Sequence, residues 1–123
     1  MRKNLLLAVA AAFLCASSVA SAADLAEGAK IFKRCHVCHS LKPGKRKVGP
    51  SLFGVIGRKA GTSEGYHYST AMRHSGLTWN EATLDTYLAN PRKVVKGTRM
   101  AFPGLKKEQD RQDVIAYIKE KSK

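Results

Sequence analysis

The stretch Cys35-His36-Val37-Cys38-His39 decides the fold of this chain. Its two thiols stand at positions i and i+3, so in a tight helical turn both sulfurs lie on one side of the backbone. This spacing, with a histidine directly after the second cysteine, is typical of covalent haem attachment. We therefore expect Cys35 and Cys38 to form thioether bonds with one haem c, and His39 to ligate its iron.

Paired cysteines also occur in redox dithiols and in zinc sites, and both alternatives need features that this chain lacks. A redox Cys-x-x-Cys dithiol does not require the histidine and usually accompanies a βαβ pattern. A structural zinc site needs four ligands, and neither a second Cys-x-x-Cys pair nor a His-x3-5-His pair follows the first. A zinc or structural module without haem is the weaker alternative.

The first residues have the organisation of an export signal rather than of a folded element. A basic start is followed by an apolar run over residues 5–14, which is too short to span a bilayer. Residues 20–22, Ala-Ser-Ala, match a signal-peptidase cleavage site. The sequence therefore predicts a secretory signal peptide over residues 1–22, one domain over residues 23–123, and a periplasmic location without a membrane span in the mature chain.

The charge balance points to acidic partners. The chain has 22 Lys and Arg residues against 9 Asp and Glu residues, and a formal net charge of +13. Such an excess favours solubility and association with acidic surfaces. A nucleic-acid partner is disfavoured because the export signal directs the protein out of the compartment that holds the DNA, and no nucleic-acid-binding motif is present.

Helix signals occur near both ends of the mature chain. Asp24 followed by Glu27 predicts a capping box, and apolar residues then recur at helical spacing as far as Cys35. Gly28 lies on this apolar face, where a glycine costs about 1 kcal/mol of helix propensity. Either another helix passes close to it or the glycine is simply tolerated near a helix start. A last helix is predicted from near Lys107 to the C-terminus, with acidic residues at its start and basic residues at its end.

The middle of the chain has signals for shorter helices. Ser69 is expected to cap a short helix that reaches His74. Thr78 and Glu81 predict a second capping box, which starts a helix over residues 79–90.

A further helix start and an irregular loop follow. Asn90-Pro91 provides an N-cap and a first-position proline for a short helix that ends at Gly97. Residues 98–105 have no hydrophobic period but carry buried-type residues, which is typical of a loop that lies on a site. With no convincing strand, the chain is predicted to be all-α, with four to five helices and long loops wrapped around one covalently bound haem.

With these residues in place, the chain resembles the small class I cytochromes c, especially their exported bacterial members. The resemblance covers essentially all of residues 23–123 and implies that the first and last helices cross at close range. It rests on an ordered series of motifs: Gly28 and Phe32, Cys35 to His39, Gly49-Pro50-Ser51-Leu52, Gly57-Arg58-Lys59-Ala60-Gly61, Trp79, Tyr87-Leu88, and Gly97-Thr98-Arg99-Met100-Ala101-Phe102.

The resemblance also implies roles for residues around the haem. It makes Met100 the second axial ligand, in agreement with the His/Met pair that cytochromes c use, with Met72 as its chief competitor. The carbonyl of Pro50 would accept the second imidazole N–H of His39, and Tyr87 would lie near the methionine sulfur. The residues expected to bind or shield the haem propionates are Arg58, Tyr68 and Trp79.

A haem iron with both axial positions filled favours outer-sphere transfer of single electrons rather than catalysis. The expected function is that of a soluble, monomeric, periplasmic electron carrier, not an enzyme, which connects respiratory or photosynthetic complexes or periplasmic redox proteins. A haem enzyme or gas sensor with a labile Met100, for example with peroxidase-like activity, is the alternative. The basic residues expected to dock acidic surfaces of redox partners are Arg34, Lys47, Arg92, Lys93, Arg99, Lys106 and Lys107.

Overall fold

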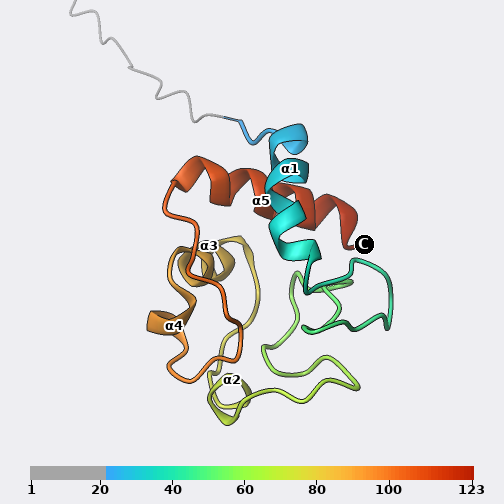
Figure 1. Cartoon of the computed structure of the whole chain (residues 1–123), viewed down its shortest axis with the longest axis vertical. Helices are drawn as coiled ribbons and strands as arrows, with labels where there is room; N and C mark the ends of the chain where they lie inside the picture. The colour runs from blue at the N-terminus through green and yellow to red at the C-terminus, as the bar shows by residue number, and fades with distance from the viewer. Residues whose placement is uncertain (1–21) are drawn as a thin grey trace, which may run out of the picture.

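The computed structural model describes residues 22–123, so the predicted signal peptide lies outside the described residues except for Ala22. The described part has five helices and no strand, only an isolated bridge between Lys59 and Thr78 (Figure 1). The prediction of an all-α fold with four to five helices and long loops is confirmed. The helices are α1 (Leu25–His36), α2 (Thr70–Arg73), α3 (Glu81–Ala89), α4 (Pro91–Val94) and α5 (Glu108–Lys121).

Helices α1 and α5 cross and form the largest contact between helices (Figure 1). They approach closely at Gly28, where an added Cβ would lie 2.2 Å from the carbonyl oxygen of Asp113. Beside this crossing, the rings of Phe32 and Tyr117 are 5.3 Å apart, and Val114 is fully buried. Of the two explanations for Gly28, the close approach of another helix is therefore correct.

The start of α1 agrees only in part with its predicted capping box. The Asp24 carboxylate accepts a hydrogen bond from the Glu27 N–H at 3.0 Å, as expected. The Glu27 side chain does not complete the box, because it pairs with Lys30. The backbone N–H of Asp24 instead donates to the buried carboxylate of Asp113 at 2.8 Å. Asp113 of α5 therefore accepts the hydrogen bond from the Asp24 N–H that the predicted capping box assigned to the Glu27 side chain.

The predicted start of α3 is wrong by two residues. Its N-cap is Asn80, which exchanges hydrogen bonds with Thr83: each side chain accepts from the other residue's N–H at 2.9 Å. Thr78 cannot cap the helix because residues 77–79 are extended and bond to residues 58–60. This pairing was not visible in the sequence, since it joins two distant segments.

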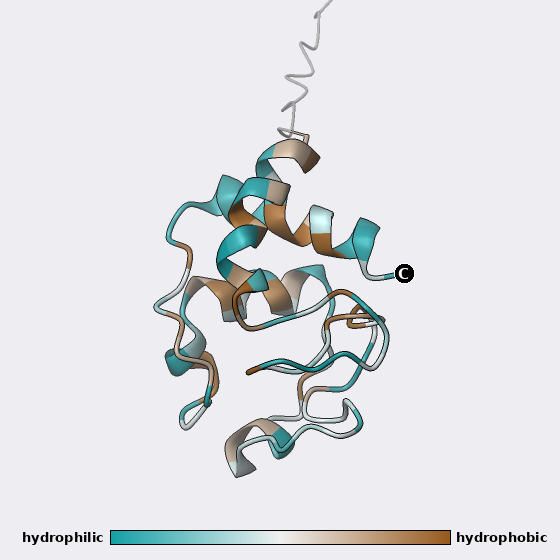
Figure 2. Cartoon of the chain, turned by 45° about the vertical axis from the view of Figure 1, so that its right-hand side comes forward, coloured by the Kyte–Doolittle hydropathy of each residue, from teal (hydrophilic) through white to brown (hydrophobic). Residues whose placement is uncertain are grey.

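The remaining helices begin as predicted and orient their apolar sides inward. The Ser69 hydroxyl accepts from the Met72 N–H at 3.0 Å, and the Asn90 side chain accepts from Lys93 N–H at 3.2 Å, with Pro91 in the first turn of α4. α5 begins after Lys107. Figure 2 shows the hydrophobic colour on the inner sides of the longer helices and the hydrophilic colour on their outer sides. The core that they enclose forms one wall of a cavity.

Candidate haem site

A cavity of about 420 Å³ lies between the end of α1, the side of α3 and the irregular loops. Its volume is within the range of cofactor sites, which are mostly apolar with a few converging polar groups. All nine residues that the sequence analysis expected around the haem line it: Cys35, Cys38, His39, Pro50, Arg58, Tyr68, Trp79, Tyr87 and Met100. The structure thus brings together segments that are far apart in the chain.

The attachment stretch forms the turn at the end of α1. The backbone N–H groups of Cys38 and His39 both donate to the Cys35 carbonyl, at 3.0 and 2.9 Å, and neither Cys35 nor Cys38 forms a disulfide. Burial raises the pKa of the Cys35 thiol, against the opposing effect of the Arg34 cation. The turn therefore brings both sulfurs to one cavity, as attachment to a single haem requires.

The His39 imidazole is held in one orientation and one tautomer. Its Nδ1 lies 2.8 Å from the Pro50 carbonyl oxygen, which can only accept, so Nδ1 carries the hydrogen. The ring packs on Gly49, where an added Cβ would be 2.5 Å from the imidazole Cε1. Burial lowers the pKa of His39, although the bond to Pro50 opposes this effect. A neutral imidazole with Nε2 free of hydrogen is the form that binds a metal.

Met100 lies on the loop that joins α4 to α5. Its backbone N–H donates to the Thr98 hydroxyl at 3.4 Å, and that hydroxyl shares a 2.8 Å hydrogen bond with the Tyr87 hydroxyl of α3. Burial raises the pKa of Tyr87, so this phenol stays protonated. Met72 of α2 also lines the cavity, but it belongs to the buried hydrophobic core.

The polar residues of the cavity wall are fixed by other hydrogen bonds. The Arg58 guanidinium donates to the carbonyls of Ser51 and Phe53, both at 3.0 Å. The Tyr68 hydroxyl accepts from the Ser63 N–H at 3.2 Å, which leaves its own proton free to be donated. These donors would suit the two carboxylates of a haem. Together with the two cysteine thiols, the neutral imidazole of His39 and the methionine thioethers of the cavity, they fit a covalently attached haem.

The seven basic residues expected to dock partners do not all lie at the cavity. Arg34 and Arg99 line it, and Arg34 stacks over the Phe102 ring at 5.1 Å. Lys47 bonds to the carbonyl of His36. The other four are exposed on α4 and just before α5: Arg92, Lys93, Lys106 and Lys107.

The sequence analysis gave no role to two valines at the cavity. Val37 and Val48 line it, yet they are 71% and 76% exposed. Side chains of this type are usually buried, so their exposure marks an apolar rim around the site. The signal that could have found them is their position, within the attachment stretch and directly before Gly49.

An all-α domain that places a Cys-x-x-Cys-His turn, a fixed neutral histidine and an apolar cavity together defines a c-type haem protein. The chain belongs to the cytochrome c family, whose sequence profile, described as "Cytochrome c", matches residues 25–122. This membership confirms the resemblance to class I cytochromes c and implies covalently bound haem c at the Cys35–His39 motif.

Individual relatives agree with this assignment. "Cytochrome c2" of Rhodomicrobium vannielii is 51% identical over 111 residues, covering 89% of each chain, and "Cytochrome c2" of Blastochloris viridis is 50% identical over 111 residues, covering 88% of this chain and 87% of the other. Among solved structures, "cytochrome cH from Methylobacterium extorquens" is 47% identical, with a TM-score of 0.75, and the match covers 80% of this chain and 99% of that one. Within residues 22–123, none of the helices is long and apolar enough to cross a membrane.

Proposed function

We propose that this protein is a soluble, monomeric, periplasmic electron carrier with one haem, and that it takes up and passes on single electrons at an exposed haem edge without catalysing a reaction. The observation that carries the proposal is that His39 and Met100 line one cavity together with both attachment cysteines. Relatives named cytochrome c2 support it. Its partners would be membrane or periplasmic redox proteins of a respiratory or photosynthetic chain with acidic docking surfaces.

Each residue group would contribute separately to this function. Haem held here supplies a one-electron couple at its iron. Cys35 and Cys38 would keep it in place covalently, and the bond from His39 to Pro50 keeps Nε2 available as a ligand. The soft thioether of Met100 favours ferrous iron and raises the reduction potential. Two protein ligands would leave no position for oxygen or peroxide, which distinguishes a carrier from a haem enzyme.

The absorbance spectrum tests the carrier against the haem-enzyme and gas-sensor alternatives. We expect the ferric protein to show a methionine–iron charge-transfer band and the ferrous protein to give no spectral shift with carbon monoxide. The same ferrous sample, unfolded in guanidinium, serves as a control and should bind carbon monoxide because Met100 then leaves the iron. A shift in the folded protein at neutral pH would favour an enzyme or sensor with a labile Met100.

The basic surface is expected to make electron transfer depend on ionic strength. With hexacyanoferrate anions in place of an acidic partner, the bimolecular rate should fall by about tenfold or more from low to high salt, because salt screens attraction between exposed charges. Reversing Lys93 to glutamate should weaken this dependence. The matched control Lys121→Glu, on the last turn of α5, should change it less. A rate that stays flat across ionic strength would contradict steering by charge.

A further inference from the structure

The loop that carries Met100 is attached to α3 on both sides of the methionine. Before Met100, Thr98 bonds to the Tyr87 hydroxyl at 2.8 Å. After it, the Leu105 N–H donates to the Leu88 carbonyl at 2.8 Å. Gly104 runs so close to the end of α3 that an added Cβ would lie 2.4 Å from the Ala89 carbonyl oxygen. The position of the sulfur therefore depends on two attachments to the same helix.

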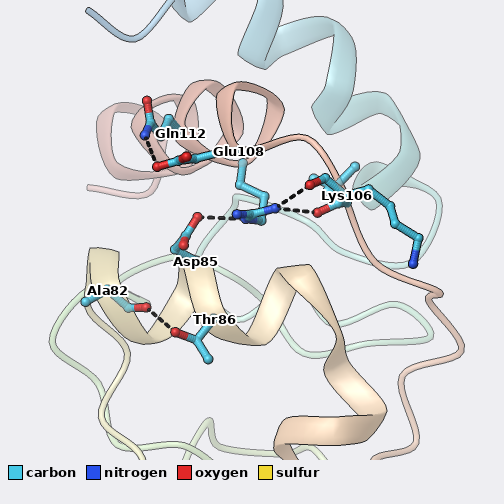
Figure 3. A network of polar contacts seen from close by, with 8 residues as sticks. Ala82, Asp85, Thr86, Lys106, Glu108 and Gln112 are labelled. Atoms are coloured by element: carbon cyan, nitrogen blue, oxygen red, sulfur yellow. Dashed lines mark hydrogen bonds and ion pairs between the residues drawn. The ribbon is translucent and has the colours of Figure 1, made fainter. Parts of the chain in front are cut away.

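Arg111 of α5 completes the second attachment. Its side chain is only 12% exposed, and its Nε pairs with the Asp85 carboxylate of α3 at 2.8 Å. Its Nη1 donates to the carbonyls of Leu105 and Lys106, at 2.8 and 2.9 Å. Figure 3 draws the contacts of Asp85 and Lys106 with this guanidinium as dashed lines, between the loop end and the two helices. One planar group thus joins α3, α5 and the end of the loop.

Resting on the proposed function, we propose that Arg111 is a positioning residue for Met100, which holds the far end of the loop so that the thioether stays on the iron. Its removal would leave the Leu105 and Lys106 carbonyls without their charged donor and free the loop end from α5. Lysine cannot replace it, because an ammonium is a point charge without the planar fork that reaches both the carboxylate and the carbonyls.

Imidazole binding to the ferric holoprotein measures this effect. Added imidazole can occupy the iron only in molecules where Met100 has left, so its apparent dissociation constant scales inversely with their fraction. Hydrogen bonds to a charged group are strong enough that Arg111→Gln should tighten imidazole binding by roughly tenfold to a hundredfold. Arg111→Lys should act in the same direction, and Asp85→Asn more weakly. Faster hydrogen exchange of the Leu105 amide should accompany the change.

Two control variants separate positioning from general destabilisation. Lys119→Gln removes an ion pair that also joins α5 to α3, at 2.6 Å from Glu81, but does not touch the loop. It should leave imidazole affinity unchanged. Val114→Ala creates a cavity in the fully buried contact of α5, and should lower the midpoint of guanidinium unfolding without tightening imidazole binding.

The outcomes separate this inference from the proposed function. Wild-type imidazole affinity in both Arg111 variants would overturn the role of Arg111 alone, as would equal tightening in Val114→Ala. A wild-type holoprotein without the methionine–iron band would overturn the proposed function and this inference together. Tighter imidazole binding in the Arg111 variants, with wild-type imidazole affinity in Lys119→Gln and Val114→Ala, would support the inference.

Discussion

Met100→Leu should abolish the methionine–iron charge-transfer band and lower the midpoint potential by more than about 59 mV, which is a tenfold change in a one-electron equilibrium. The substitution removes the soft sulfur but keeps an apolar side chain of similar volume, so the fold should lose little stability. The ferrous variant should also bind carbon monoxide. Absorbance spectroscopy and potentiometric titration of the holoprotein measure all three changes.

Met72→Leu is the matched control, since Met72 also lines the cavity. It should keep the band and the midpoint potential of the wild type, because a core side chain of α2 does not need its sulfur. If Met72→Leu lost the band and Met100→Leu kept it, the assigned ligand would be wrong and the competing methionine would take its place.

Gly28→Val should lower the free energy of unfolding by about 3 kcal/mol, the upper part of the usual range for overpacking. The valine Cβ would have to occupy a point 2.2 Å from a backbone oxygen of α5, and neither helix can yield there without disturbing the buried Val114. Guanidinium unfolding of the holoprotein, followed by circular dichroism, measures the loss.

Lys33→Val supplies the comparison on the same helix. Lys33 is exposed on α1, so this variant carries the same new side chain without the steric clash. Its free energy of unfolding should stay within about 0.5 kcal/mol of the wild type, as for most surface substitutions. Equal stabilities for the two valine variants would show that the crossing of α1 and α5 tolerates a side chain at position 28.

Some residues of the candidate site could be predicted from sequence spacing, and others only from the resemblance to a family. The roles of Cys35, Cys38 and His39 followed from spacing alone, since these residues are adjacent in the chain. Those of Met100, Pro50 and the polar residues depended on the resemblance to a family. The structure places all nine residues at one cavity, whereas the axial ligation by His39 and Met100 stays a prediction.

Two features of the structure were not predicted: the contacts of Arg111 and the exposed valines of the cavity rim. Nothing in the local pattern distinguishes Arg111 from the other basic residues, because its partners Asp85 and Leu105 lie in other segments of the chain. For the exposed valines of the cavity rim, only their positions in the sequence gave a signal, because a sequence gives the type of a residue while its exposure depends on what packs around it.

The sequence by itself determined what acts over a few residues: the haem-attachment turn and the helix starts at Asp24, Ser69 and Asn90. A cap or an attachment motif needs only neighbouring atoms, so its spacing is visible in the chain. The tertiary structure decided the start of α3, the bond from Asp24 to Asp113 and the hydrogen bonds of Arg111 to α3 and to the end of the Met100 loop. Such contacts join distant segments, and they form only when burial of the core offsets the conformational entropy lost in bringing those segments together.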